Sequence, residues 1–164
     1  MSKIINLFGN NGGNDMVTII DVADAFLSYE SMTPKKLQKL CYYTQAWHEA
    51  LKGTALIDNR FEAWVHGPVC PELYYKYRHK GWLEIPKKEQ TSVNISDEIF
   101  EFLDEIYDTY GHLDGDELEA LTHSELPWQE QRIGLAVYEP SNNEISVESM
   151  KKFYGEMYEQ NQGE

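Results

Sequence analysis

The stretch TPKKLQKLCYYTQAWHEAL, residues 33–51, is the clearest structural element in this sequence. Thr33 is a favourable N-cap, and Pro34 follows at the first helical position, where its missing N–H costs nothing. Gly53 stands where a helix commonly ends. At 100° per residue, one face carries a mostly apolar set, namely Leu37, Leu40, Cys41, Thr44, Trp47, His48 and Leu51. The opposite face carries Lys35, Lys39, Tyr42 and Ala46, so we predict that Tyr42 is exposed.

Outward from this helix, apolar periodicity and capping residues predict further helices. They cover about 18–29, 71–79, 97–110 and 116–123, with a short turn from Pro127 and a last helix after Ser146. Residues 61–65 alternate as a strand does, 82–86 look extended, and 66–69 are predicted to break the first of these. The expected fold is mainly α: a single compact helical domain of about six helices, with a minor extended or β element around 61–65 and 82–86.

The ends of the chain differ in composition from the middle. Residues 9–15 are almost all Asn and Gly, which favours a flexible lead over residues 1–16. We expect one domain over 17–158 and a frayed tail over 159–164. Because the lead is too short for a helix-turn-helix, direct DNA binding is not expected.

Charge is distributed unevenly along the 164 residues, whose net charge is −14. Residues 1–90 sum to +1 and residues 91–164 to −15. An acidic half repels nucleic acid and suits a basic protein partner, although a solvated helix surface gives the same count. Two isolated cysteines predict a reducing compartment, and the N-terminus lacks a signal-peptide pattern. We therefore expect a cytoplasmic protein with no membrane segment.

The residues that could carry chemistry form no strong motif. The five histidines are too far apart for a helical zinc pair, so no metal or cofactor is expected. Cys70 lies at a predicted helix N-terminus, with His66 four residues earlier as a conceivable base. The alternative is a small half-buried residue in a turn, which we favour. His48 is interpreted as a core histidine, and the acidic run 114–119 as a helix N-terminus. No catalytic residue is predicted.

Four sequence blocks together resemble a known family. Residues 33–47 resemble the opening signature of the SocA-like Panacea antitoxin domain. The next block is Phe61-Glu62-Ala63-Trp64, then Gly67-Pro68-Val69 and Tyr74, and a late block is His123-Ser124-Glu125-Leu126-Pro127-Trp128. Residues 145–154, with Met150 between, resemble the closing helix. The order and approximate spacing hold from about residue 17 to 158.

The resemblance implies a mainly α-helical antitoxin of a bacterial or prophage toxin–antitoxin pair, and no enzyme. It would neutralise a protein toxin, commonly a translation inhibitor, by direct contact. The acidic residues 97–119 would then suit a toxin with a basic active site. The alternative is a proteolytic adaptor or an acidic decoy that binds a partner. The candidate partner contacts are Tyr42, Trp64, His66, Pro68, Tyr74 and Trp128.

Overall fold

Helices account for most of the computed structural model, which describes residues 16–162. Within that range the elements are α1 (Ile19–Leu27), α2 (Pro34–Lys52), β1 (Glu62–Trp64), β2 (Gly67–Val69), α3 (Pro71–Tyr77), η1 (Arg78–Lys80), η2 (Gln90–Ser92), α4 (Asp97–Tyr110), α5 (Gly115–His123), α6 (Leu126–Glu130) and α7 (Val147–Gln162). The prediction of a mainly α domain is confirmed, with seven α-helices among these residues instead of about six. The expected lead falls almost wholly on residues 1–15, outside the described residues.

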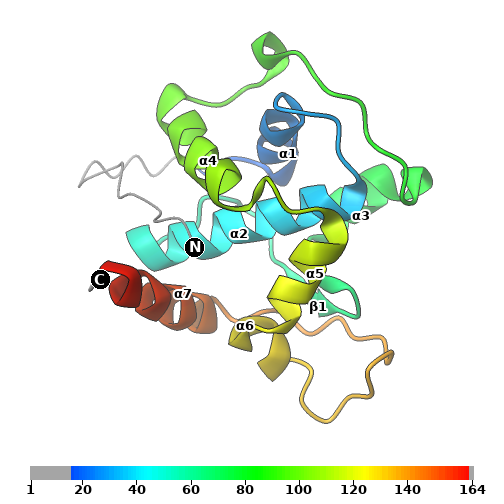
Figure 1. The fold of residues 1–164 in the computed structure, drawn as a ribbon, viewed down its shortest axis with the longest axis vertical. Helices are drawn as coiled ribbons and strands as arrows, with labels where there is room; N and C mark the ends of the chain where they lie inside the picture. The colour runs from blue at the N-terminus through cyan, green and yellow to red at the C-terminus, as the bar shows by residue number, and fades with distance from the viewer. Residues whose placement is uncertain (1–15, 163–164) are drawn as a thin grey trace.

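Helix α2 lies at the centre of the fold, and the other helices surround it (Figure 1). Its start is as predicted, because the Thr33 hydroxyl accepts a hydrogen bond from the backbone N–H of Lys36 and Pro34 follows. Gly53 ends the helix in the left-handed region at φ 74°, where a residue without a Cβ meets no steric penalty.

The two-faced pattern predicted for α2 is wrong. Tyr42 and Lys39 are each only 1% exposed, and Ala46 is buried as well. The reason is that α1, α4, α5 and α7 all pack against α2, so no face of its middle turns is left to solvent. A helical wheel records the period of a pattern, but it cannot show that both faces meet other elements.

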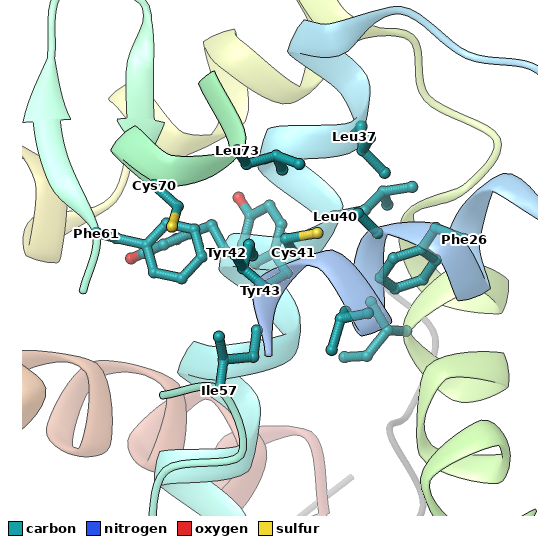
Figure 2. Close-up of a cluster of buried hydrophobic side chains, with 14 of the residues drawn as sticks. Phe26, Leu37, Leu40, Cys41, Tyr42, Tyr43, Ile57, Phe61, Cys70 and Leu73 are labelled. Carbon is teal, nitrogen blue, oxygen red and sulfur yellow. The ribbon is translucent and has the colours of Figure 1, made fainter. Parts of the chain in front are cut away.

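The hydrophobic core forms where α1, α2 and the hairpin region meet (Figure 2). Phe26 from α1 and Leu40 and Cys41 from α2 lie together there, with Phe61 and Leu73 from the segments that follow. All five are fully buried, and the chain supplies them from positions far apart in sequence. The core thereby fixes α3 and the hairpin against the first half of α2.

Residues 62–69 form a tight antiparallel hairpin. Glu62 pairs with Val69 and Trp64 with Gly67, so the chain turns at Val65 and His66. The first strand ends before residue 66, as expected, but residues 67–69 return as β2, a second strand that the sequence pattern does not predict. The Gly67 backbone has φ +106°, which disfavours any residue with a Cβ. In the predicted 82–86 element, only Ile85 makes a bridge, to Met32.

Side-chain caps begin α1, α4 and α5, largely as predicted. Thr18 and Asp21 form a capping box at α1, and Ser96 caps α4. The Asp114 carboxylate starts α5, one residue earlier than predicted. Helix α7 begins after Ser146 and continues to Gln162, beyond the expected domain end at 158. Among residues 16–162, no helix combines the length and apolar character needed to cross a membrane.

Candidate functional site

A groove of about 790 Å³ opens beside the first two turns of α2. Its walls come from α2, the hairpin turn, α3 with η1, the segment at Gly81 and Trp82, and the loop between α6 and α7. The lining side chains are mostly aromatic or aliphatic, and they include Pro34, Leu37, Trp64, Val69, Leu73, Tyr74, Tyr77 and Trp82. Binding sites in proteins are commonly concave, apolar and of this size, so the groove is the leading candidate site.

Helix α2 holds the inner wall of the groove through two side chains. The Gln38 amide N–H donates to the Cys70 carbonyl at 3.0 Å, and its oxygen accepts the Cys70 N–H at 2.9 Å. The Lys39 Nζ donates to the Pro68 carbonyl at 3.1 Å. The aliphatic part of Lys39 packs where a side chain at position 67 would be. A Cβ at Gly67 would lie 2.6 Å from Lys39 Cε, which is too close. These contacts lock the hairpin and the start of α3 onto α2.

The far wall depends on a buried arginine. Arg132 lies in the loop after α6, and its guanidinium donates to the Ala63 carbonyl at 2.9 Å and to the Glu139 carbonyl at 2.6 Å. One side chain therefore ties β1 to the loop that brings Pro140 to the groove. Charge-assisted hydrogen bonds of this kind are among the stronger polar contacts in proteins.

Aromatic side chains continue from the groove onto the open surface. The Trp64 ring packs edge-on against Tyr74, with centroids 4.8 Å apart, and Tyr74 packs against Tyr75 at 5.6 Å. Tyr75 is 62% exposed and Trp82 is 89% exposed, and Leu83 beside Trp82 is exposed too. We call Tyr74, Tyr75, Trp82 and Leu83 the aromatic rim. Clustered exposed side chains of this type mark interaction surfaces, whereas isolated ones do not.

Charged groups on the α5 side of the groove are paired internally. Lys35 Nζ lies 2.9 Å from Asp116 and 2.7 Å from Glu119, and His66 Nδ1 lies 3.1 Å from Glu119. Hydrogen bonds from Lys35 and His66 to the Glu119 carboxylate outweigh the effect of burial and lower its pKa. Lys39 differs, because burial away from water lowers the pKa of its amine to about 7.

The family model for the antitoxin SocA-like Panacea domain matches residues 37–129. The chain belongs to this family. The match takes in most of α2, the whole hairpin, α3 and most of α6, so it covers most of the groove and the aromatic rim. The resemblance inferred from the sequence blocks is confirmed. No curated protein and no solved structure matches the chain.

The six predicted contact residues of the Panacea domain lie in four different places. Trp64, His66 and Tyr74 line the groove. Trp128 lies behind it, where its Nε1 donates to the Trp64 carbonyl at 2.8 Å and its ring stacks on His123. Pro68 is buried, and its carbonyl accepts a hydrogen bond from Lys39. The exposure predicted for Tyr42 is wrong, because its side chain lies in the core.

Sequence reasoning missed Tyr75, Arg78, Trp82 and Leu83. One signal pointed to Tyr75: the tyrosines of a seven-residue helix cannot all face inward, and Tyr77 is the one that does. Trp82 gave no such signal, since a tryptophan in an extended segment is as compatible with a core position. Only the tertiary packing shows that Ile85, and not Trp82, turns inward from this segment.

A second polar cluster of the Panacea domain lies in its interior. Glu125 accepts hydrogen bonds from the hydroxyls of Tyr43 and Tyr154, both at 2.8 Å. Because Tyr154 donates its proton to Glu125, the Tyr42 hydroxyl, 3.1 Å away, must donate to Tyr154. Burial raises the pKa of Glu125 to about 7. We call Glu125, Tyr42, Tyr43 and Tyr154 the buried tyrosine cluster.

The Cys70–His66 pair considered from sequence is not assembled as a dyad. The Cys70 thiol donates to the Glu72 carboxylate at 3.1 Å, whereas His66 contacts Glu119. Burial raises the pKa of Cys70 to about 12, and burial also raises that of Cys41. Both thiols are therefore held in the protonated form, which is a poor nucleophile. Within residues 16–162, no group of three His, Cys, Asp or Glu is arranged to hold a metal ion.

Proposed function

We propose that this Panacea domain neutralises a protein toxin by binding it directly, with the groove and the aromatic rim as the docking surface. The observation that carries the proposal is the exposure of Trp82 in the groove lining, with Leu83 beside it in sequence, and of Tyr75, which packs on the groove-lining Tyr74. Large aromatic side chains dominate the binding energy of many protein interfaces. The surface also falls largely inside the segment that defines the family.

The acidic surface of α4 would serve a different role in the same encounter. Asp97, Glu98, Glu101, Asp104 and Asp108 are all exposed on this helix. A toxin with a basic active site, such as a translation inhibitor in the bacterial cytoplasm, would be attracted over a distance by these charges. Part of the acidic run is already in use, because Asp114 and Glu117 cap α5 while Asp116 and Glu119 pair with Lys35. Steering would therefore depend on α4.

The test is co-expression of this chain in bacteria with each neighbouring open reading frame. One neighbour should arrest growth, and the wild-type chain should restore growth and co-purify with that product. The Tyr75→Ala/Trp82→Ala variant should fold normally but lose both rescue and co-purification. Failure to find any toxic neighbour, or rescue with no complex, would contradict direct neutralisation.

Tyr138→Ala is the matched control, because Tyr138 is an equally exposed aromatic outside the groove lining. It should rescue as wild type does. If Tyr138→Ala loses rescue and the Tyr75/Trp82 variant keeps it, the docking surface lies on the loop after α6. The lifetime of the toxin separates neutralisation from the adaptor alternative: an adaptor shortens it, whereas an antitoxin of the proposed kind leaves an intact toxin in a stable complex.

A further inference from the structure

The groove has a charge opposite to that of the protein as a whole. Its ionisable lining residues other than tyrosine are Lys35, Lys39, His66 and Arg78, and no Asp or Glu belongs to the lining found among residues 16–162. The full chain nevertheless carries 28 acidic against 14 basic residues. A basic lining in so acidic a protein selects the occupant of the groove by charge, independently of its apolar walls.

Two of the four groups contact carboxylates of α5, and two do not. Lys35 forms ion pairs with Asp116 and Glu119, and the His66 ring lies within hydrogen-bond distance of Glu119. In the part of the chain that the structure describes, Lys39 and Arg78 have no ion pair with a carboxylate. Lys39 uses one of its three donors on the Pro68 carbonyl, and the exposed Arg78 lies 5.4 Å from the centroid of the Tyr75 ring. Because Lys39 is almost fully buried and its pKa is about 7, Arg78 is the group of this pair that offers an incoming carboxylate an exposed positive charge.

Arg78 lies in a segment of α3 and η1 that carries further basic side chains. Lys76, His79 and Lys80 come from the same turn of chain as Arg78, and none of them forms an ion pair among the described residues. Lys76 also lies over the Tyr77 ring at 5.6 Å. Two of these cations, Lys76 and Arg78, therefore lie beside tyrosine rings of α3.

We propose that the groove binds a linear apolar segment of a partner polypeptide that carries a carboxylate, which pairs with Arg78 at the mouth while apolar side chains pack on Trp64, Tyr74 and Trp82. Lys39 lies on the inner wall, where its amine donates a hydrogen bond to the Pro68 carbonyl. The inference rests on the proposed function in one respect, namely that the partner is the toxin. A polypeptide fits better than nucleic acid, because a net charge of −14 repels a phosphate backbone and most of the lining is apolar.

The experiment is selection of a phage-displayed library of random twelve-residue peptides on the full chain. We expect enriched peptides to combine aromatic or aliphatic residues with Asp, Glu or a free C-terminus. Replacing the acidic residue of a selected peptide by its amide should weaken binding about tenfold, the effect typical of one charged interface contact. Arg78→Glu and Trp82→Ala should each weaken binding by at least about as much.

Two variants outside the groove serve as matched controls for the loss of a charge and of an apolar side chain. Lys152→Glu removes an exposed cation from α7, and Ile133→Ala removes an exposed apolar side chain. Both residues lie outside the groove lining, so both variants should bind selected peptides as wild type does. Because Arg78→Glu reverses a charge beside Tyr75, Arg78→Gln provides a milder variant, with a smaller loss of the same sign. Circular dichroism of each variant shows whether it is folded.

The inference is overturned if no peptide is enriched, if basic peptides are enriched, or if selected peptides bind the Arg78 and Trp82 variants undiminished. It is also overturned if a labelled single-stranded RNA of twenty nucleotides binds and the same variants abolish that binding. Because the selection needs no toxin, it can succeed where the co-expression test finds no toxic neighbour. Conversely, if the Arg78→Glu variant still rescues growth, the antitoxin function stands. The proposal that the bound segment pairs a carboxylate with Arg78 is then wrong.

Discussion

The buried tyrosine cluster and the aromatic rim use the same residue types for opposite purposes. In the cluster, Tyr43 and Tyr154 point their hydroxyls at one carboxyl group, and burial costs little because each hydroxyl has a partner. In the rim, Tyr75 and Trp82 expose large apolar surfaces that the fold leaves uncovered. The comparison teaches that aromatic content alone does not locate an interface. What separates the two regions is burial: the hydroxyls of the cluster are hydrogen-bonded in the interior, whereas the rings of Tyr75 and Trp82 are exposed.

Glu125→Ala should produce the largest change in stability. It leaves the hydroxyls of Tyr43 and Tyr154 without an acceptor and opens a cavity between α2 and α7. We expect a loss of about 3–4 kcal/mol in the free energy of unfolding at pH 5, measured by urea denaturation. Glu125→Gln keeps an acceptor of the same shape and should cost less than about 1 kcal/mol. Equal losses for the two variants would mean that the hydroxyl contacts to this side chain do not stabilise the fold.

The pH dependence of stability tests the protonation of Glu125 in the same cluster. The unfolded chain releases the Glu125 proton near pH 4.5, whereas the folded chain holds it to about pH 7. The contribution of Glu125 to the free energy of unfolding is therefore fully present below pH 4.5. It falls by on the order of 3 kcal/mol as the pH rises to about 7. Subtracting the profile of Glu125→Gln from that of wild type isolates the effect. A flat difference between pH 4.5 and 7 would contradict the buried carboxyl.

The two regions also differ in how far the sequence predicts them. Helix starts depend on local chemistry, so Thr18, Thr33 and Ser96 are identified correctly from the residues beside them. The environment of Tyr42 depends on α7, more than one hundred residues further along the chain. Helical periodicity contains no information about that contact. It therefore predicts that Tyr42 is exposed, although the side chain is buried.

The candidate site shows the same limit. Trp64, His66 and Tyr74 are found because they lie within or beside family blocks, and a hairpin and a short helix bring them together. Arg78 and Trp82 join them through the packing of η1 and the following turn, which no local pattern specifies. The acidic run 97–119 is visible as composition, yet only the structure separates the internal partners of α5 from the exposed acids of α4.

Gly67→Ala should have an intermediate effect, at the boundary between the groove and the core. The added Cβ would adopt a backbone conformation at φ +106° that residues with side chains avoid, and it would lie 2.6 Å from Lys39 Cε. We expect a loss of about 2 kcal/mol in the free energy of unfolding. The Gly67→Ala/Lys39→Ala variant should lose less free energy of unfolding than the sum of the two single variants. The reason is that shortening Lys39 removes the clash, although the backbone strain stays. Strict additivity of the two changes would mean that the close contact is not the cause.

Trp82→Ala should have the smallest effect on stability and thereby complete the contrast with Glu125→Ala. Because Trp82 is 89% exposed, its removal uncovers little core, and the free energy of unfolding should change by less than about 0.5 kcal/mol. Thermal and urea denaturation of the free protein measure this directly. A loss comparable to that of Glu125→Ala would assign Trp82 to the fold. An unchanged stability together with lost toxin binding would mean that the ring is kept exposed for a partner, since an exposed ring with no partner contributes nothing to either measurement.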